Sequence, residues 1–426
     1  MKRFLNYSRP EIRAALCMGG AAFFLLMGYE FIRSSATSLF IAEFGKDAIP
    51  VATLFMPLAV IAFLYAYGRL LGRFGAKWTL VATTLGSGCL IAIGFVAHHS
   101  GLKFASAGLY VLREAYVVLI LEQYWSYINS KVTRDDARKL NGPVCGISSL
   151  GAIAGGMTTA AIVGNVGSEN LLLLAALACV PASLLSVLAF RIGGDPRGQG
   201  SHPGHVAKSD AHGAKADWRD VVGLNLMRKE PILAWLLAMV LTTQVVAAMT
   251  DFAFQGMLAD ALPDTDARTA YLGNFFAKLN MFALGLQVIG APILLSWLRY
   301  DWINLAIPIV QIGTCAWAAL EPSLASTGAA FMTFKAIDYS LFRAAKEILY
   351  IPLSFDARYR SKELIDVFGY RFGKGGASLA VTVAAAQGVV FTAGRYAALA
   401  LSAVFFWLIL VIPAIGLLRR HQRSGD

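Results

Sequence analysis

Basic side chains interrupt the apolar stretches of this chain, and they are the residues whose types and spacing could do chemistry. Each costs about 2.5–3.5 kcal/mol in hydrocarbon on insertion scales. A folded bundle gains nothing from so many, whereas a water-filled path for an anion requires them. The pattern therefore predicts a transporter of a small, negatively charged solute. The eight residues are Arg33, Arg113, Lys278, Lys335, Arg343, Lys346, Arg371 and Lys374.

The densest group of cations lies in the last third of the chain. Arg343 and Lys346 are three residues apart, so they share one face of a helix. Two cations on one face suit contact with a carboxylate or phosphate. We expect at least two of four cations to contact the substrate, and salt-bridge gating is the alternative. The four are Arg343, Lys346, Arg371 and Lys374.

Arg33 and Arg113 are the candidate anion ligands of the first half. Glu30 and Arg33 are one helical turn apart, so they could neutralise each other, which lowers the cost of burying both. The alternative is that Arg33 faces a cavity and is released to an anion. Arg113 directly precedes Glu114, and adjacent helical residues point about 100° apart. We therefore expect that the two do not face one partner, and that one of them reaches another helix or the cavity.

Other charged residues in the same stretches are candidates for coupling or gating. A desolvated carboxylate at Glu114 could carry a coupling proton. Asp251 and Lys278 fall in the outer halves of consecutive spans, where they form either a gating salt bridge or a structural pair. The full set is Glu30, Glu114, Asp251, Lys278, Asp338, Glu347 and Asp366.

The elements that must position these residues are membrane-spanning helices. The 426 residues are 57% hydrophobic and 15% charged, whereas a soluble domain has about 25% charged residues. Basic residues outside the spans number 25 in one set of alternate loops and four in the other, which places both termini in the cytoplasm. The net charge of +11 therefore reflects topology and predicts no nucleic-acid binding. We predict an all-α integral membrane protein with about twelve spans, near 14–41, 48–70, 77–97, 104–129, 140–165, 169–190, 231–258, 269–297, 302–320, 323–352, 362–389 and 396–418.

The long central loop divides the spans into two groups of six. We predict an N-terminal six-helix bundle at 1–191, a cytoplasmic linker at 192–230 with a surface helix near 217–229, and a C-terminal six-helix bundle at 231–426. Six plus six spans is the plan of the major facilitator superfamily. Glycines at spacing four are expected to form helix-packing faces. They are Gly142, Gly146, Gly151, Gly155, Gly369, Gly373 and Gly376.

Cysteine and histidine usage predicts no disulfide framework, metal site or cofactor. The five cysteines lie singly within spans, without a CxxC motif or a His/Cys cluster. Neither a metal-ligand cluster nor a nucleophile–base pair stands out, so we predict that the chain is not an enzyme.

Two adjacent motifs resemble those of a known family. Residues 338–353, DYSLFRAAKEILYIPL, resemble the KYSLFDxxKEMAYIPL stretch of the bacterial and plastid ATP/ADP translocase family. Residues 361–376 resemble its GKAxxDVxxxRxGKSxG continuation. Weaker echoes lie at Ile32–Arg33 and at Glu114, Trp125 and Asn129.

The resemblance implies exchange of nucleotides across a membrane by a major-facilitator-like fold, with functional charges in spans 1, 4, 7 and 10. Of these charges, Glu114 and Lys346 are present. The span 1 Lys falls at Ala36, and the span 7 acid and Lys fall near Met249 and Ala253, with Asp251 as a displaced substitute. We interpret the chain as a divergent member for a less charged nucleotide or another phosphorylated or carboxylated metabolite.

The leading hypothesis is a monomeric secondary transporter of the bacterial inner membrane, working by alternating access through exchange or ion coupling. One alternative is a proton-driven exporter of amphiphiles or drugs, with Glu114 as the proton site. Another is a non-transporting sensor or scaffold, although charges inside both halves argue against it.

Overall fold

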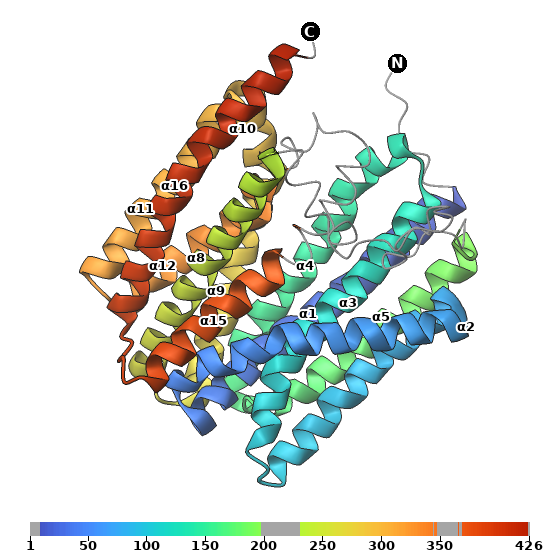
Figure 1. The fold of residues 1–426 in the computed structure, drawn as a ribbon. Helices are drawn as coiled ribbons and strands as arrows, with labels where there is room; N and C mark the ends of the chain where they lie inside the picture. The colour runs from blue at the N-terminus through green and yellow to red at the C-terminus, as the bar shows by residue number, and fades with distance from the viewer. Residues whose placement is uncertain (1–8, 197–230, 344, 347–364, 366–368, 425–426) are drawn as a thin grey trace, which may run out of the picture. The chain divides into compact units, whose positions relative to one another are not determined.

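The computed structural model describes residues 9–196, 231–343, 345–346, 365 and 369–424. Its secondary structure is helical, and no strand occurs among these residues. Nine segments within the described ranges are long and apolar enough to cross a membrane. This confirms an all-helical membrane protein, and the count of twelve spans stays a prediction. Figure 1 shows the helices in chain order.

Six helical elements lie before the central loop. They are α1 (Pro10–Phe44), the short 3-10 helix η1 (Lys46–Ala48), α2 (Ile49–His99), α3 (Phe104–Lys131), α4 (Arg134–Val166) and α5 (Asn170–Gly193). α2 is interrupted at Gly75, whose φ of 70° and ψ of 173° are not helical. Only glycine adopts such a φ without strain. The kink therefore separates two helical arms that correspond to the predicted spans near 48–70 and 77–97.

The elements after the central loop include two π-helical turns, which are η2 (Leu286–Gly290) and η3 (Asp338–Phe342). η2 joins α9 to α10 across the predicted span near 269–297, and η3 continues α12. The helices are α8 (Pro231–Ala261), α9 (Thr265–Gly285), α10 (Ala291–Trp297), α11 (Tyr300–Leu320), α12 (Leu324–Ile337), α15 (Tyr370–Ala386) and α16 (Ala393–Ser424).

Two compact units account for the described residues. The first unit takes in the described parts of Met1–Ala48, Phe55–Gly204 and Leu262–Met281. The second takes in those of Ile49–Leu54, His205–Ala261 and Phe282–Asp426. The start of α2 thus groups with the second unit and most of α9 with the first. The predicted bundle boundaries stay a prediction, and the predicted surface helix near 217–229 lies outside the described residues.

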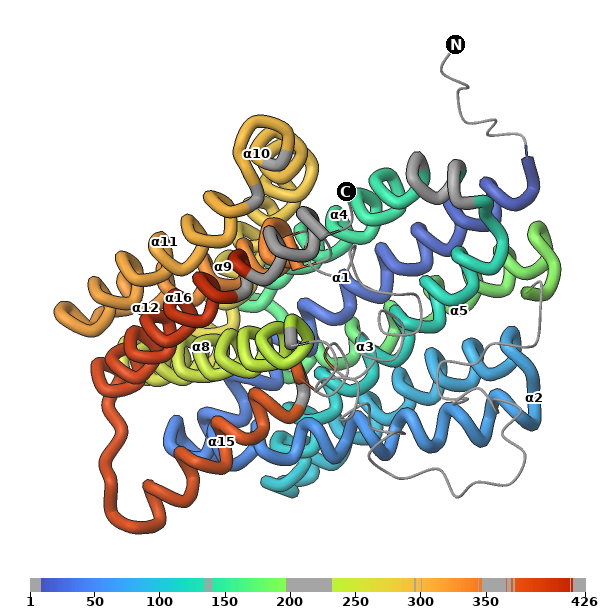
Figure 2. Tube along the Cα trace, turned by 45° about the horizontal axis from the view of Figure 1, so that its top comes forward, coloured from blue at the N-terminus to red at the C-terminus, as the bar shows by residue number. Residues whose placement is uncertain are grey.

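Helix α1 is the centre of the first unit, where it packs against α3, α4 and α5 (Figure 2). Two α4 glycines allow this approach. A Cβ atom at Gly151 would lie 2.1 Å from the Phe23 carbonyl oxygen, and one at Gly155 would lie 2.5 Å from that of Met27. The predicted packing role is therefore confirmed at these two positions. At Gly142 and Gly146 a Cβ would meet no described atom within 4 Å, so the packing role stays a prediction there.

Helix α8 is the corresponding centre of the second unit, with α12, α15 and α16 against it. The glycines of the family-like motif face it. A Cβ atom at Gly369 would lie 3.0 Å from Val240, and one at Gly373 would lie 2.7 Å from the Gln244 Cβ. The packing role is confirmed for both, while a Cβ at Gly376 would meet no described atom within 4 Å. The close approach brings Lys374 of α15 beside α8.

Candidate functional site

Glu30 and Arg33 form the predicted pair within α1, and α9 adds a third member. The Arg33 Nη1 lies 3.4 Å from the Glu30 Oε1, and the Asn280 amide donates to the same oxygen at 2.9 Å. Glu30 is buried, and its Oε2 has no hydrogen-bond partner among the described residues. A buried carboxylate with one oxygen shared by two donors and the other unsatisfied is poised to change partners.

The Arg33 guanidinium also lies over two aromatic rings. Its central carbon lies 3.4 Å from the centre of the Phe276 ring and 5.6 Å from that of Tyr29. A guanidinium stacked on a ring keeps its N–H groups in one plane, pointing outward from the contact. Phe276 belongs to α9, so this helix contributes both the ring and the amide of Asn280 to the cluster on α1.

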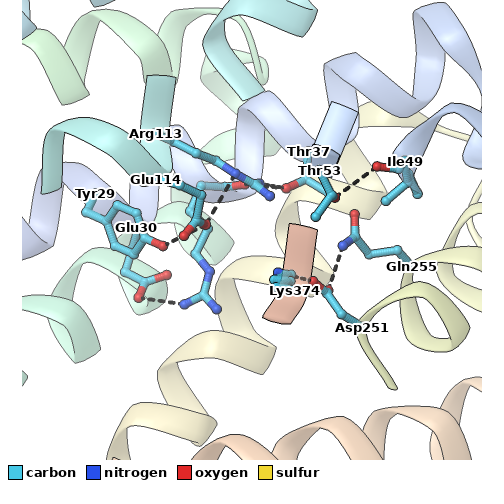
Figure 3. A network of polar contacts seen from close by, with 11 residues as sticks. Tyr29, Glu30, Thr37, Ile49, Thr53, Arg113, Glu114, Asp251, Gln255 and Lys374 are labelled. Carbon is cyan, nitrogen blue, oxygen red and sulfur yellow. Dashed lines mark hydrogen bonds and ion pairs between the residues drawn. The ribbon is translucent and has the colours of Figure 1, made fainter. Parts of the chain in front are cut away.

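Arg113 of α3 reaches the backbone of α1 one turn further along. Its Nη1 donates to the Arg33 carbonyl oxygen at 2.9 Å and to the Thr37 hydroxyl (Figure 3). Its guanidinium carbon also lies 4.0 Å from the centre of the Tyr110 ring. Arg113 is therefore a buried link between α3 and α1.

Glu114 of α3 also contacts α1, at a residue nearer the N-terminus of that helix. Its Oε1 accepts a hydrogen bond from the Tyr29 hydroxyl at 3.2 Å and lies 3.7 Å from the Arg113 Nε (Figure 3). The two adjacent side chains contact different residues of α1, which are Tyr29 for Glu114 and Thr37 for Arg113. The expectation that one of them reaches another helix is confirmed, and both do so.

Asp251 of α8 is the centre of the charged cluster in the second unit. Lys374 of α15 donates to its Oδ2 at 3.0 Å, and Gln255 donates to its Oδ1 at 2.6 Å (Figure 3). Lys335 of α12 also acts electrostatically on this carboxylate. The sequence suggested Lys278, an exposed residue of the first unit, as the partner of Asp251, and that pair stays a prediction. Within its own unit Asp251 pairs with Lys374, one of the four cations expected to contact the substrate.

Lys346 is buried beside an aromatic residue of α15. Its Nζ lies 3.4 Å from the Tyr370 hydroxyl oxygen and 4.7 Å from the ring centre. Arg343, predicted to share its face, is exposed. Arg343 and Lys346 are therefore one exposed and one buried cation.

Some candidates lie outside the described residues. They are Glu347, Asp366 and the side chain of Arg371. Within the part of the chain that the structure does describe, no group of three or more His, Cys, Asp or Glu residues could hold a metal ion.

The sequence alone missed several neutral partners and one structural cation. Gln255 and Asn280 carry no charge, although each lies four residues after a site residue, Asp251 or Phe276, and so shares its helical face. From the sequence, Arg268 is one of the four basic residues in the less basic set of loops. It is buried, and its guanidinium donates to the carbonyl oxygens of Ser38, Leu262 and Pro263 at 2.9–3.0 Å.

Comparison with known proteins finds one family and several curated relatives that this chain resembles. The family described as TLC ATP/ADP transporter matches residues 324–416, a range that contains Lys335, Asp338, Lys346 and Lys374. Two curated relatives are ADP,ATP carrier protein 1 of Rickettsia conorii and ADP,ATP carrier protein 3 of Rickettsia bellii. The first is 23% identical over 87% of this chain and 85% of its own length, and the second is 20% identical over 86% of each.

The chain is similar to the TLC ATP/ADP transporter family at residues 324–416, and to ADP,ATP carrier proteins over most of its length. This confirms the resemblance at residues 338–376.

Solved structures of transporters have a similar fold. A crystal structure of the nucleoside transporter NupG has a TM-score of 0.64 at 12% identity and covers 95% of this chain and 99% of its own. The in meso structure of the POT family transporter PepTSo has a TM-score of 0.65 at 12% identity, with 96% and 98% covered. At such identities the likeness concerns the fold alone.

Proposed function

We propose that this chain is a secondary active transporter that moves a nucleotide or another phosphorylated anion across a membrane by alternating access. The observation that carries the proposal is the burial of three cations on helices of this family's fold. Arg33, Arg113 and Lys346 are 8%, 5% and 4% exposed. Cations so placed inside a membrane protein mark a path for anions. The matched relatives are named as ADP,ATP carriers, which supports a nucleotide as the class of solute.

Exchange of partners at the cations is the proposed mechanism. In each unit a carboxylate already neutralises a candidate cation, through Glu30 and Arg33 in one and Asp251 and Lys374 in the other. A phosphate oxygen can replace a carboxylate oxygen on the same N–H donors with little change in geometry. Binding of the anion then releases the carboxylate, and the released carboxylate is free to pair elsewhere as the protein changes conformation.

The assignment of roles follows from this exchange. The proposed substrate ligands are Arg33, Arg113, Arg343, Lys346, Arg371 and Lys374. The proposed coupling and gating residues are Glu30, Glu114, Asp251, Lys278, Asp338, Glu347 and Asp366.

Uncharged residues at three positions where the resemblance implies charges limit the charge that the solute can carry. Ala36, Met249 and Ala253 stand where the resemblance implies charged residues, and all three are buried. Fewer cations neutralise less phosphate charge in a desolvated site. We therefore propose a solute with fewer charges than ATP, such as a nucleoside monophosphate or another phosphorylated or carboxylated metabolite.

We also propose the number of membrane spans and the side of the membrane on which the termini lie. The loop charges support about twelve spans in two six-helix bundles, with both termini in the cytoplasm. A monomer in the bacterial inner membrane is the proposed state and location.

Uptake into proteoliposomes tests this function. Purified protein is reconstituted, loaded with unlabelled solute, and assayed with labelled ATP, ADP, AMP, glucose 6-phosphate and inorganic phosphate. We expect saturable uptake of at least one phosphorylated solute, stimulated by internal solute of the same class. Lys346→Gln should lower it at least tenfold, whereas Lys103→Gln, in an exposed loop, should not change it.

Two results would refute the proposal. One is the absence of uptake for every anion of the panel in liposomes that contain folded protein. The other is equal uptake by the wild type and Lys346→Gln, because the charge at the proposed ligand would then not matter.

A further inference from the structure

Helix α2 has all of its Lys and Arg residues at one place, the corner between its two arms. They are Arg69, Arg73 and Lys77, and the helix contains no Asp or Glu. The corner is the break at Gly75, where α2 changes direction (Figure 2). Both arms are apolar and longer than the roughly 20 residues that a bilayer requires, so the corner lies at a membrane surface.

No carboxylate neutralises these three cations in the described part of the chain. Neither Arg69, Arg73 nor Lys77 has a carboxylate oxygen within 4.0 Å there. Another surface cation of the first unit does have one, since the Lys103 Nζ lies 4.0 Å from a Glu43 carboxylate oxygen. Arg69 and Arg73 are exposed and one helical turn apart, so they share one face of the first arm. The corner is therefore a cluster of positive charge without a counter-charge among the described residues.

Aromatic rings lie beside the two arginines. The guanidinium carbon of Arg69 is 5.6 Å from the centre of the Tyr65 ring, and that of Arg73 is 5.5 Å from the centre of the Phe74 ring. The Arg69 Nη1 also donates to the Tyr65 hydroxyl oxygen at 3.3 Å, which leaves the hydroxyl proton for another acceptor. A ring attracts a cation but does not remove its charge, so both guanidinium groups keep N–H donors for an anion.

Lys77 repeats this arrangement after the corner. Its Nζ is 5.1 Å from the centre of the Trp78 ring. All three rings are largely uncovered, since Tyr65, Phe74 and Trp78 are 67%, 50% and 58% exposed. Tyrosine and tryptophan are enriched where a membrane meets water, because each has an apolar ring and a polar group. The corner therefore offers apolar rings and positive charges to the same partner.

We propose that the corner of α2, residues 65–78, is a binding site for an anionic phospholipid of the membrane. The lipid phosphate accepts hydrogen bonds from Arg69 and Arg73, whose planar guanidinium groups match phosphate oxygens. The Lys77 ammonium adds a third positive charge beside it. The apolar part of the lipid covers the rings of Phe74 and Trp78.

A dissolved anion fits this surface less well than a lipid. Inorganic phosphate would neutralise the cations but leave the rings of Phe74 and Trp78 in water. A lipid brings phosphate and hydrocarbon together and is already held at the level of the corner by the bilayer. Negatively charged membrane surfaces attract basic residues that lie next to spanning helices. The combination of rings and cations thus favours a lipid headgroup over a free phosphate.

Thermal unfolding of the full chain in dodecyl maltoside tests the site without any transported solute. Phosphatidylglycerol, phosphatidylcholine and inorganic phosphate are added separately as probes. A ligand that binds only the folded state raises the unfolding midpoint. We expect a rise of several degrees with phosphatidylglycerol and a clearly smaller one with the other two probes. An equal rise with inorganic phosphate would identify a site for dissolved anions, and an equal rise with phosphatidylcholine would show that the charge is irrelevant; either would overturn the proposal.

A triple variant locates the effect at the corner. Arg69→Gln/Arg73→Gln/Lys77→Gln should lose the difference between phosphatidylglycerol and phosphatidylcholine, because the proposed donors to the phosphate are gone. A difference that persists in this variant would overturn the assignment of the corner as the site.

The matched control removes three exposed positive charges elsewhere, so it lowers the net charge of the chain by the same amount. It is Lys103→Gln/Arg299→Gln/Arg395→Gln, and it should keep the difference between the two lipids. Loss of the difference in the control as well would mean a non-specific attraction of lipid to a basic protein, which would also overturn the site.

Native mass spectrometry of the wild type adds a measurement that needs no variant. Protein released from micelles with equal amounts of the two lipids should retain phosphatidylglycerol in several-fold excess over phosphatidylcholine. The excess should fall when salt is added to the micelles, because salt screens exposed charges. Equal retention of the two lipids would overturn the proposal. The proposed transport function would be unaffected by that result, because no solute is transported in these measurements.

Discussion

The Lys374 ammonium lies 3.0 Å from the Asp251 carboxylate and joins α15 to α8. Gln255 donates to the other carboxylate oxygen, so both oxygens of Asp251 have partners within the second unit. The close approach of the two helices at Gly373 makes this contact possible. A cation of the family-like motif is thus held by an acid in the very span where the resemblance implies one.

Removal of either charge should destabilise the protein more than removal of both. Asp251→Asn leaves a largely buried ammonium without its counter-charge, and Lys374→Gln leaves the carboxylate. Loss of one partner of a buried pair costs about 3–5 kcal/mol. We expect the double variant to have a higher midpoint of thermal unfolding in detergent than either single variant. Strictly additive losses would show that the pair contributes no coupling.

Arg33→Lys should weaken anion transport although it keeps the charge. An ammonium cannot lie flat on the Phe276 ring and offer several coplanar N–H donors, as the guanidinium does. The stacking contributes about 0.5–2 kcal/mol. In uptake assays we expect a raised KM for Arg33→Lys, and a smaller further effect of Phe276→Leu in that background than in the wild type. Equal effects of Phe276→Leu in both backgrounds would contradict this.

Gly151→Ala should destabilise the first unit, whereas Gly142→Ala in the same helix should not. The new Cβ at position 151 would lie 2.1 Å from a backbone oxygen of α1, so the two helices must separate. Overpacking of this kind costs about 1–3 kcal/mol. At Gly142 a Cβ would meet no described atom within 4 Å, and alanine favours a helix. Fluorescence-detected thermal unfolding of the two variants makes the comparison, and equal midpoints would contradict the packing interpretation.

Arg268→Gln should lower stability without changing the charge of the candidate site. The guanidinium satisfies carbonyl oxygens of Ser38, Leu262 and Pro263, which ties the start of α9 to α1. Hydrogen bonds to charged groups contribute about 1.5–3 kcal/mol each. We expect a clear fall in the unfolding midpoint, and little change for Lys103→Gln, whose side chain is exposed. Similar unfolding midpoints for Arg268→Gln and Lys103→Gln would contradict a structural role for Arg268.

The amino-acid sequence by itself determined the class of protein and many of its candidate residues. Long apolar stretches predict membrane-spanning helices, because a helix needs about 20 consecutive apolar residues to cross the hydrocarbon core. The charges inside these stretches predict a path for an anion. The pair of Glu30 and Arg33 was predictable for the same local reason, since residues three apart share a helical face. The two motifs at 338–376 showed the resemblance to ATP/ADP translocases without any knowledge of the fold.

Only the tertiary structure decided which partner each charge takes. Asp251 pairs with Lys374, 123 residues away, and Asn280 reaches Glu30 across 250 residues. Helical periodicity assigns a residue to a face but leaves open which helix that face meets. The same limit explains Arg268, whose charge suggested a loop while its position between three carbonyl groups makes it part of the packed interior.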